Sequence, residues 1–210
     1  PGKMALACAK LGIPLVHIST DYVFDGTRTI PWAISDTPNP KTAYGRSKLK
    51  GEKAIQATKC TYVILRTSWI FSAHGNNFLK TMLRLSEKRD SLPVIEDQVG
   101  GPTCASDVAH SCVSIAKQLI DDPSKTGIYH FSGKPDVSWC KFANTIFEQA
   151  GRETVATPIT SSEYHTPALR PSNSRLDCTF TKEVFGISRP NWNDGLEQIL
   201  SDLENMNGNT

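Results

Sequence analysis

IPLVHIS, at residues 13–19, is a short apolar run rich in β-branched side chains, as is typical of a buried parallel strand. A second run of this kind, TYVILRTS, occupies residues 61–68. Between them, Thr42 is placed to cap a helix that extends to about Ala57. A strand, a helix and a further strand in this order predict a parallel sheet with a right-handed crossover. We therefore expect an α/β fold with a doubly wound parallel sheet.

The rest of the chain continues this alternation. A helix ends at Gly12, and GIYHFSG at residues 127–133 and LPVIED at residues 92–97 read as strands. Residues 152–177 are rich in Pro, Ser and Thr, and we expect them to be irregular. Four more helices are predicted, at residues 76–88, 106–120, 138–150 and 192–204. The second of these begins with a cap-like Ser106–Asp107 pair.

Composition excludes several classes of function. The 210 residues contain 23 basic and 21 acidic side chains without a block of like charge, which argues against a nucleic-acid or membrane-surface partner. The six cysteines form no C-x-x-C pair, and the five histidines show no metal-ligand spacing. No apolar run approaches a transmembrane helix, and the first residues do not resemble a signal peptide. We expect a cytoplasmic protein with reduced thiols and no metal site.

Tyr44 and Lys48 lie four residues apart in the predicted helix 42–57, so their side chains share one face. An ammonium group beside a phenol favours the phenolate and lowers the tyrosine pKa from its usual value of about 10. A tyrosine tuned in this way can exchange a proton with a developing alkoxide near neutral pH. The pair indicates the chemistry of a carbonyl reductase. Its alternative reading is an exposed helix with an aromatic and a lysine on one side.

Residues that follow the two strands should meet the Tyr44–Lys48 pair. Thr20 follows the first strand and Ser68–Trp69 follow the second. Ligands of parallel sheets bind beyond the carboxyl ends of the strands, so these segments should converge on one crevice. Trp69 offers a broad apolar face at this position, and its alternative role is that of a core tryptophan.

Five segments, read in order, resemble one family. They are STDYVFDG at 19–26, YGRSKLKGE at 44–52, RTSWIF at 66–71, DQVGGPT at 97–103 and RPSNSRLD at 170–177. Together they resemble the extended short-chain dehydrogenase/reductases and, more narrowly, the dTDP-4-dehydrorhamnose reductases among them. That family reduces the 4-keto group of dTDP-4-dehydrorhamnose to give dTDP-L-rhamnose, a precursor of bacterial polysaccharides. The resemblance implies a Rossmann-like sheet and NADPH or NADH as cofactor.

The resemblance also implies residue roles. Tyr44 is the expected proton donor, Lys48 assists it and contacts the cofactor ribose, and Thr20 hydrogen-bonds the substrate carbonyl oxygen. Cofactor contacts are expected from Tyr44, Lys48 and Ser19. Expected contacts to the nucleotide sugar come from Asp21, Tyr22, Trp69, Asn77 and Arg170. Sugar-nucleotide dehydratases typically carry Asp-Glu after the threonine, whereas Tyr22 follows Asp21 here, which favours the reductase.

The chain departs from the family at its N-terminal side. It contains no Gly-x-Gly-x-x-Gly or Gly-x-x-Gly-x-x-Gly turn for the cofactor pyrophosphate. We therefore expect residues 1–95 to form the C-terminal half of the cofactor-binding domain, with the catalytic residues, and residues 96–210 to form a smaller substrate-binding region. A partial record of a longer enzyme, or a truncated protein, would explain the difference, and this chain alone should bind NADPH poorly.

Two other functions stay open. One is a non-catalytic binding subunit similar to the regulatory subunit of methionine adenosyltransferase. The other is a reductase of a different nucleotide sugar. The family is often dimeric, so a homodimer is one candidate, but the sequence identifies no interface and leaves the oligomeric state open.

Overall fold

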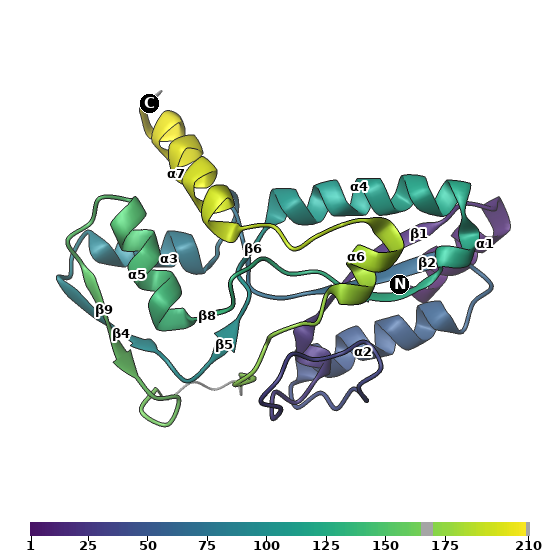
Figure 1. Cartoon of the computed structure of the whole chain (residues 1–210), viewed down its shortest axis with the longest axis horizontal. Coiled ribbons are helices and arrows are strands. Elements are labelled where there is room, and N and C mark those ends of the chain that lie inside the picture. The colour runs from purple at the N-terminus through teal and green to yellow at the C-terminus, as the bar shows by residue number, and fades with distance from the viewer. Residues whose placement is uncertain (165–169, 209–210) are drawn as a thin grey trace.

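The computed structural model describes residues 1–164 and 170–208. Within these ranges no helix is long and apolar enough to span a membrane. The helices and strands form two units that lie side by side, with short linking strands between them (Figure 1).

The first unit is built on a three-stranded parallel sheet with the order β1-β2-β7, where β1 is Leu15–Thr20, β2 is Tyr62–Thr67 and β7 is Gly127–His130. Thr20 pairs with Thr67, and Arg66 pairs with His130, so the carboxyl ends of the strands are level. Successive residues of a strand point to opposite faces, and the fully buried Val63, Ile64 and Leu65 supply both faces of the sheet.

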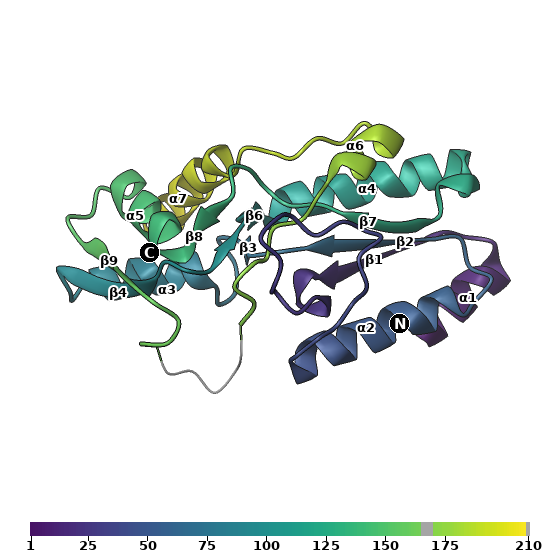
Figure 2. The same cartoon turned by 60° about the horizontal axis from the view of Figure 1, so that its bottom comes forward.

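Helices cover both faces of this sheet (Figure 2). On one face lie α1 (Gly2–Leu11) and α2 (Ala43–Gln56), whose apolar residues pack with Leu15 and Ile64. On the other lie α4 (Ala105–Asp121) and the short α6 (Thr179–Phe185). The predicted α/β architecture with a doubly wound parallel sheet is confirmed.

The second unit packs three helices around a two-stranded parallel sheet. Its strands are β4 (Ser91–Ile95) and β9 (Val155–Ile159). Its helices are α3 (Phe78–Ser86), α5 (Trp139–Gln149) and α7 (Trp192–Gly208). Their shared core is largely aromatic and aliphatic, with Phe142, Ile146 and Leu196 fully buried.

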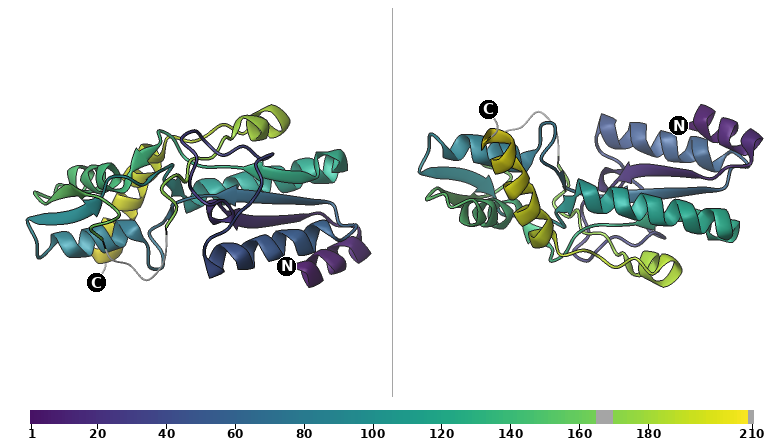
Figure 3. Two further views of the ribbon diagram at one scale, coloured as in Figure 1. Left: turned by 90° about the horizontal axis from the view of Figure 1, so that it is seen from below. Right: turned by 90° about the horizontal axis from the view of Figure 1, so that it is seen from above.

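Two small sheets link the units. Strand β3 (Ile70–Phe71) pairs in parallel with β6 (Thr103–Cys104), and β5 (Val99–Gly100) pairs antiparallel with β8 (Val137–Ser138). The chain crosses between the units several times, and Figure 3 shows both units from below and from above. The boundary predicted at residues 95–96 falls at the end of β4, within the second unit.

Two local predictions need correction, and two short elements were missed. The segment 152–177 is not irregular throughout, because β9 forms within it, and its residues 165–169 lie outside the described residues. The helix α6 and the 3₁₀ turn η2 (Pro123–Lys125) were not predicted. Cys104 occupies the N-cap position of α4 without a side-chain hydrogen bond, so Ser106 and Asp107 lie in the first turn and do not cap it.

Candidate active site

Thr20 lies at the carboxyl end of β1, where the chain turns into the 3₁₀ helix η1 (Asp21–Val23). Its hydroxyl is the N-cap of that turn and accepts a hydrogen bond from Tyr22 N at 3.2 Å. The same hydroxyl donates to Asp21 Oδ1 at 3.0 Å. The turn holds Thr20, which is only 5% exposed, in a fixed position at the end of the strand.

Tyr44 and Lys48 lie near the start of α2, which the Thr42 hydroxyl caps by accepting from Gly45 N at 3.0 Å. Gly45 faces the η1 turn, and a Cβ there would collide with the Tyr22 carbonyl oxygen. This close approach brings the Tyr44 ring edge-on to the Tyr22 ring, with 5.7 Å between centroids. Tyr44 is nevertheless 54% exposed, so its surface is open to a ligand.

The Lys48 ammonium reaches back to the sheet and donates to the Ile18 carbonyl oxygen at 2.7 Å. Burial lowers the pKa of Lys48, and the nearby Glu52 carboxylate partly opposes this effect. The strand that carries Thr20 and the helix that carries Tyr44 are thus tied together beside the predicted catalytic residues.

A buried ion pair fixes α2 on the sheet below this position. Glu52, which is 1% exposed, accepts from Arg66 Nε at 3.0 Å and from Arg66 Nη2 at 2.7 Å. It also accepts from the Ser19 hydroxyl at 2.5 Å. Glu52 follows Lys48 by one helical turn, so one carboxylate sets the position of α2 relative to β1 and β2.

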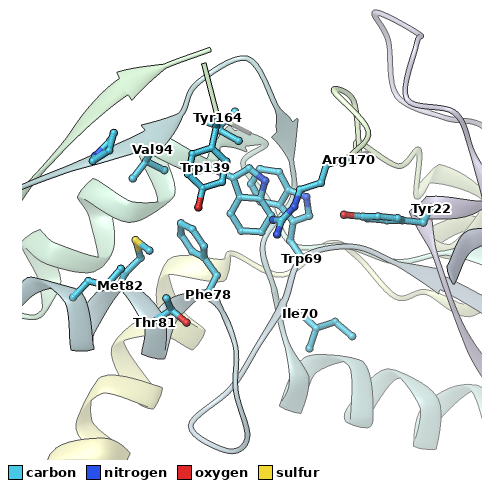
Figure 4. A pocket seen from close by; sticks show the side chains of 13 residues that line it. Tyr22, Trp69, Ile70, Phe78, Thr81, Met82, Val94, Trp139, Tyr164 and Arg170 are labelled. Carbon is cyan, nitrogen blue, oxygen red and sulfur yellow. The ribbon is translucent and has the colours of Figure 1, made fainter. Parts of the chain in front are cut away.

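A cavity of about 590 Å³ opens between the two units, beside the η1 turn (Figure 4). Its size is within the range of small-molecule sites, and its wall is mostly apolar with a few polar groups. The predicted substrate-binding residues Tyr22, Trp69 and Arg170 all line it. The remaining lining residues come mainly from the second unit: Ile70, Phe78, Thr81, Met82, Leu85, Pro93, Val94, Ile95, Trp139 and Tyr164.

Two stacked tryptophans form one wall of this cavity. The rings of Trp69 and Trp139 are nearly parallel, with 3.5 Å between centroids, and Phe78 lies 4.5 Å from the Trp139 ring. Trp69 has a φ of +48°, a left-handed conformation that a tryptophan rarely adopts. Gly100 leaves room for its ring, because a Cβ there would lie 2.7 Å from Trp69 Cε2.

The other predicted residues lie off this cavity. Asp21 is 3% exposed, and burial raises its pKa to about 6. Asn77 caps α3 by accepting from Lys80 N at 3.1 Å, and its amide donates to the Ser72 carbonyl oxygen. Ser19 is also buried, with its hydroxyl bound to Glu52.

Sequence reasoning did not identify Trp139, Phe78 or Tyr164 as cavity residues. Trp139 is the first residue of α5 and was included only in a predicted helix. Its partner in the stack, Trp69, lies 70 positions earlier in the chain, and no local pattern links the two. The sequence places Phe78 and Trp139 at the first positions of α3 and α5, and Trp69 directly before β3, which is a weak signal for a shared site.

Comparison with known proteins finds one matching family model and sequence relatives that share one name. Residues 1–205 match the family described as the RmlD substrate binding domain. The dTDP-4-dehydrorhamnose reductase of Sinorhizobium fredii is 43% identical over 203 residues, which cover 94% of this chain and 69% of that protein. The Escherichia coli protein of the same name is 38% identical over 208 residues and is covered to the same extent, 69%.

Solved structures agree with these sequence relatives. A dTDP-4-dehydrorhamnose reductase from Clostridium acetobutylicum superposes with a TM-score of 0.89 at 37% identity, over 97% of this chain and 71% of that one. The Bacillus anthracis enzyme in complex with NADP gives a TM-score of 0.86 at 35% identity, over 96% of this chain and 70% of that one. The resemblance inferred from the five sequence segments is confirmed: the chain belongs to the family of the RmlD substrate binding domain.

Proposed function

We propose that this protein provides the catalytic and substrate-binding part of an NAD(P)H-dependent reductase that acts on the 4-keto group of dTDP-4-dehydrorhamnose. The observation that carries the proposal is the position of the Thr20 and Tyr44 segments beside a tryptophan-lined cavity in a chain of this family. The relatives' names, dTDP-4-dehydrorhamnose reductase, indicate the reaction.

Tyr44 is the proposed general acid. Its exposed ring lies beside Tyr22, which lines the cavity, so a substrate carbonyl entering from the cavity can reach the phenol. Proton transfer from a positioned side chain contributes about 10²–10⁴-fold to rate. Lys48 stands one turn along the same helix and supplies positive charge beside the reacting oxygen. Thr20 completes the set by hydrogen-bonding that oxygen as it gains negative charge.

The cavity wall suits a nucleotide sugar. Trp69 and Trp139 offer flat apolar faces to a sugar or base ring, and the Arg170 guanidinium can pair with a phosphate. Burial raises the pKa of the Tyr22 phenol, so Tyr22 stays neutral as a hydrogen-bonding group of this wall.

Among the described residues, those that fit a nicotinamide cofactor can contact its nicotinamide ribose. Tyr44 is exposed, and the Lys48 ammonium lies at the open edge of β1, where both can hydrogen-bond a ribose. The Ser19 hydroxyl gives its proton to Glu52, so in this proposal it can contact the cofactor only as a hydrogen-bond acceptor. When bound, the cofactor supplies the hydride, which no side chain can provide.

The test is oxidation of NADPH in the presence of dTDP-4-dehydrorhamnose, and this and every kinetic test below uses an active enzyme that carries these residues together with a complete glycine-turn half of the cofactor-binding domain. Tyr44→Phe keeps the ring and removes the proton donor, so kcat should fall by about 10²-fold or more. Tyr62→Phe is the matched control, because it removes a hydroxyl at the opposite end of the sheet, at the start of β2. Equal turnover of the two variants would remove Tyr44 from the catalytic role.

A further inference from the structure

The Asp21 carboxyl lies directly behind the Thr20 hydroxyl. Asp21 Oδ1 accepts the hydroxyl proton at 3.0 Å, while Tyr22 N donates to the hydroxyl oxygen at 3.2 Å. A hydroxyl has one proton and two lone pairs. In this arrangement the proton points into the protein, and one lone pair remains for a ligand.

This arrangement conflicts with the role proposed for Thr20. A ketone oxygen is only an acceptor, so Thr20 must turn its proton towards the substrate to stabilise it. An ionised Asp21 is also only an acceptor and competes for that proton. A protonated Asp21 can instead donate to Thr20 Oγ1, which frees the threonine proton for the substrate.

The surroundings of Asp21 allow both protonation states. Among the charged and titratable groups, Tyr22 adjoins Asp21, and Tyr44 of α2 and Arg170 lie close to Tyr22. Among the described residues Asp21 forms no ion pair. Burial raises the pKa of Asp21 to about 6, and nearby hydroxyls oppose the rise. Ser174 lies close enough to lower the pKa of Asp21 and so oppose the rise, but Asp21 Oδ2 has no hydrogen-bond partner among the described residues.

We propose that the protonation state of Asp21 sets the direction of the Thr20 hydroxyl, and so decides whether Thr20 donates to a ketone or accepts from an alcohol. Asp21 is a positioning residue in this proposal, which rests on the proposed reductase function. The protonated form favours the keto substrate. The ionised form favours the hydroxyl of the product, whose proton can enter the free lone pair of Thr20.

The first test is the pH profile of kcat/KM for ketone reduction. In the wild-type protein, kcat/KM should fall by about tenfold per pH unit above the Asp21 pKa, until the rate of the ionised form is reached. Asp21→Asn cannot ionise and should lose this limb of the profile. Asp121→Asn, at the exposed end of α4, is the control and should keep it. A limb near pH 6 that persists in Asp21→Asn would overturn the proposal.

Two further variants ask whether Asp21 acts through Thr20. Thr20→Ser keeps a hydroxyl and should keep the limb, although at a changed rate. Thr20→Val has no hydroxyl to direct, so its remaining activity should lack the limb. A limb retained in Thr20→Val would show that Asp21 acts by another route.

A measurement without turnover covers the case in which a variant is poorly active. Because the folded pKa of Asp21 lies above that of an exposed aspartate, its ionisation removes stability as the pH rises to and through about 6. The melting temperature of Asp21→Asn, relative to that of the wild type, should therefore rise between pH 4.5 and pH 7.5, which is about 1.5 pH units either side of that pKa. A constant difference would overturn the titration of Asp21. If Tyr44→Phe turned over normally while the Asp21 results held, the proposed general acid alone would be wrong.

Discussion

Replacing Glu52 with Gln should test how strongly the buried ion pair stabilises the first unit. Glu52 and Arg66 are 1% and 2% exposed, and the carboxylate accepts three hydrogen bonds from Ser19 and Arg66. Removing one partner of such a pair leaves a buried, uncompensated charge, at a cost of about 3–5 kcal/mol. At about 2–4 °C per kcal/mol for a chain of this size, the melting temperature should fall by roughly 6–20 °C.

Thermal and urea unfolding of four proteins would measure this effect: wild type, Glu52→Gln, Arg66→Met and the double variant. The double variant removes both charges and should lose less stability than the sum of the single variants, by at least about 1 kcal/mol. Glu197→Gln makes the same substitution at an exposed position of α7 and should stay within about 0.5 kcal/mol of wild type. The reasoning would be refuted if the stability losses of the two single variants added up to that of the double variant, or if Glu52→Gln were as stable as Glu197→Gln.

Three other predictions concern the cavity and the core. Trp139→Ala removes half of the stacked pair and should raise KM for the nucleotide sugar by roughly 2- to 12-fold with a smaller change in kcat, as steady-state kinetics would show. Gly100→Ala should also raise KM, because its Cβ displaces the Trp69 ring; unchanged kinetics in a folded variant would contradict this. Burial lowers the pKa of His130 to about 3, so the unfolded chain takes up a proton as the pH falls below about 6.5 and the folded chain does not. Wild type should therefore lose more stability than His130→Asn between pH 7.5 and pH 5 in thermal melts.

Local signals explain why the first unit was predictable from sequence. The runs at 13–19 and 61–68 are apolar and β-branched because both faces of β1 and β2 are covered by helices. Thr42 was correctly identified as the cap of α2, and Gly12 takes the left-handed conformation expected at the end of α1. Each of these features depends on residues within one turn or one strand.

The second unit was less predictable because tertiary pairing overrides its local pattern. Strand β9 has the sequence VATPI and lies in a Pro- and Thr-rich region, and it exists because it pairs with β4, where Pro93 faces Thr157. The cavity shows the same limit. Its Tyr22, Trp69 and Arg170 were identified by resemblance, whereas Trp139 reaches Trp69 through the tertiary packing of α5 against its neighbours, among them α3, β4 and β9.

The stacked pair also gives the protein a built-in optical reporter. Trp32 and Trp192 are buried, at 5% and 2% exposure, and each indole N–H is bound to a backbone carbonyl oxygen. Trp69 and Trp139 are half-buried at the cavity, so a ligand that enters it changes the surroundings of these two chromophores. Intrinsic fluorescence should therefore follow cavity occupancy directly, with Trp32 and Trp192 as a constant background and no attached dye.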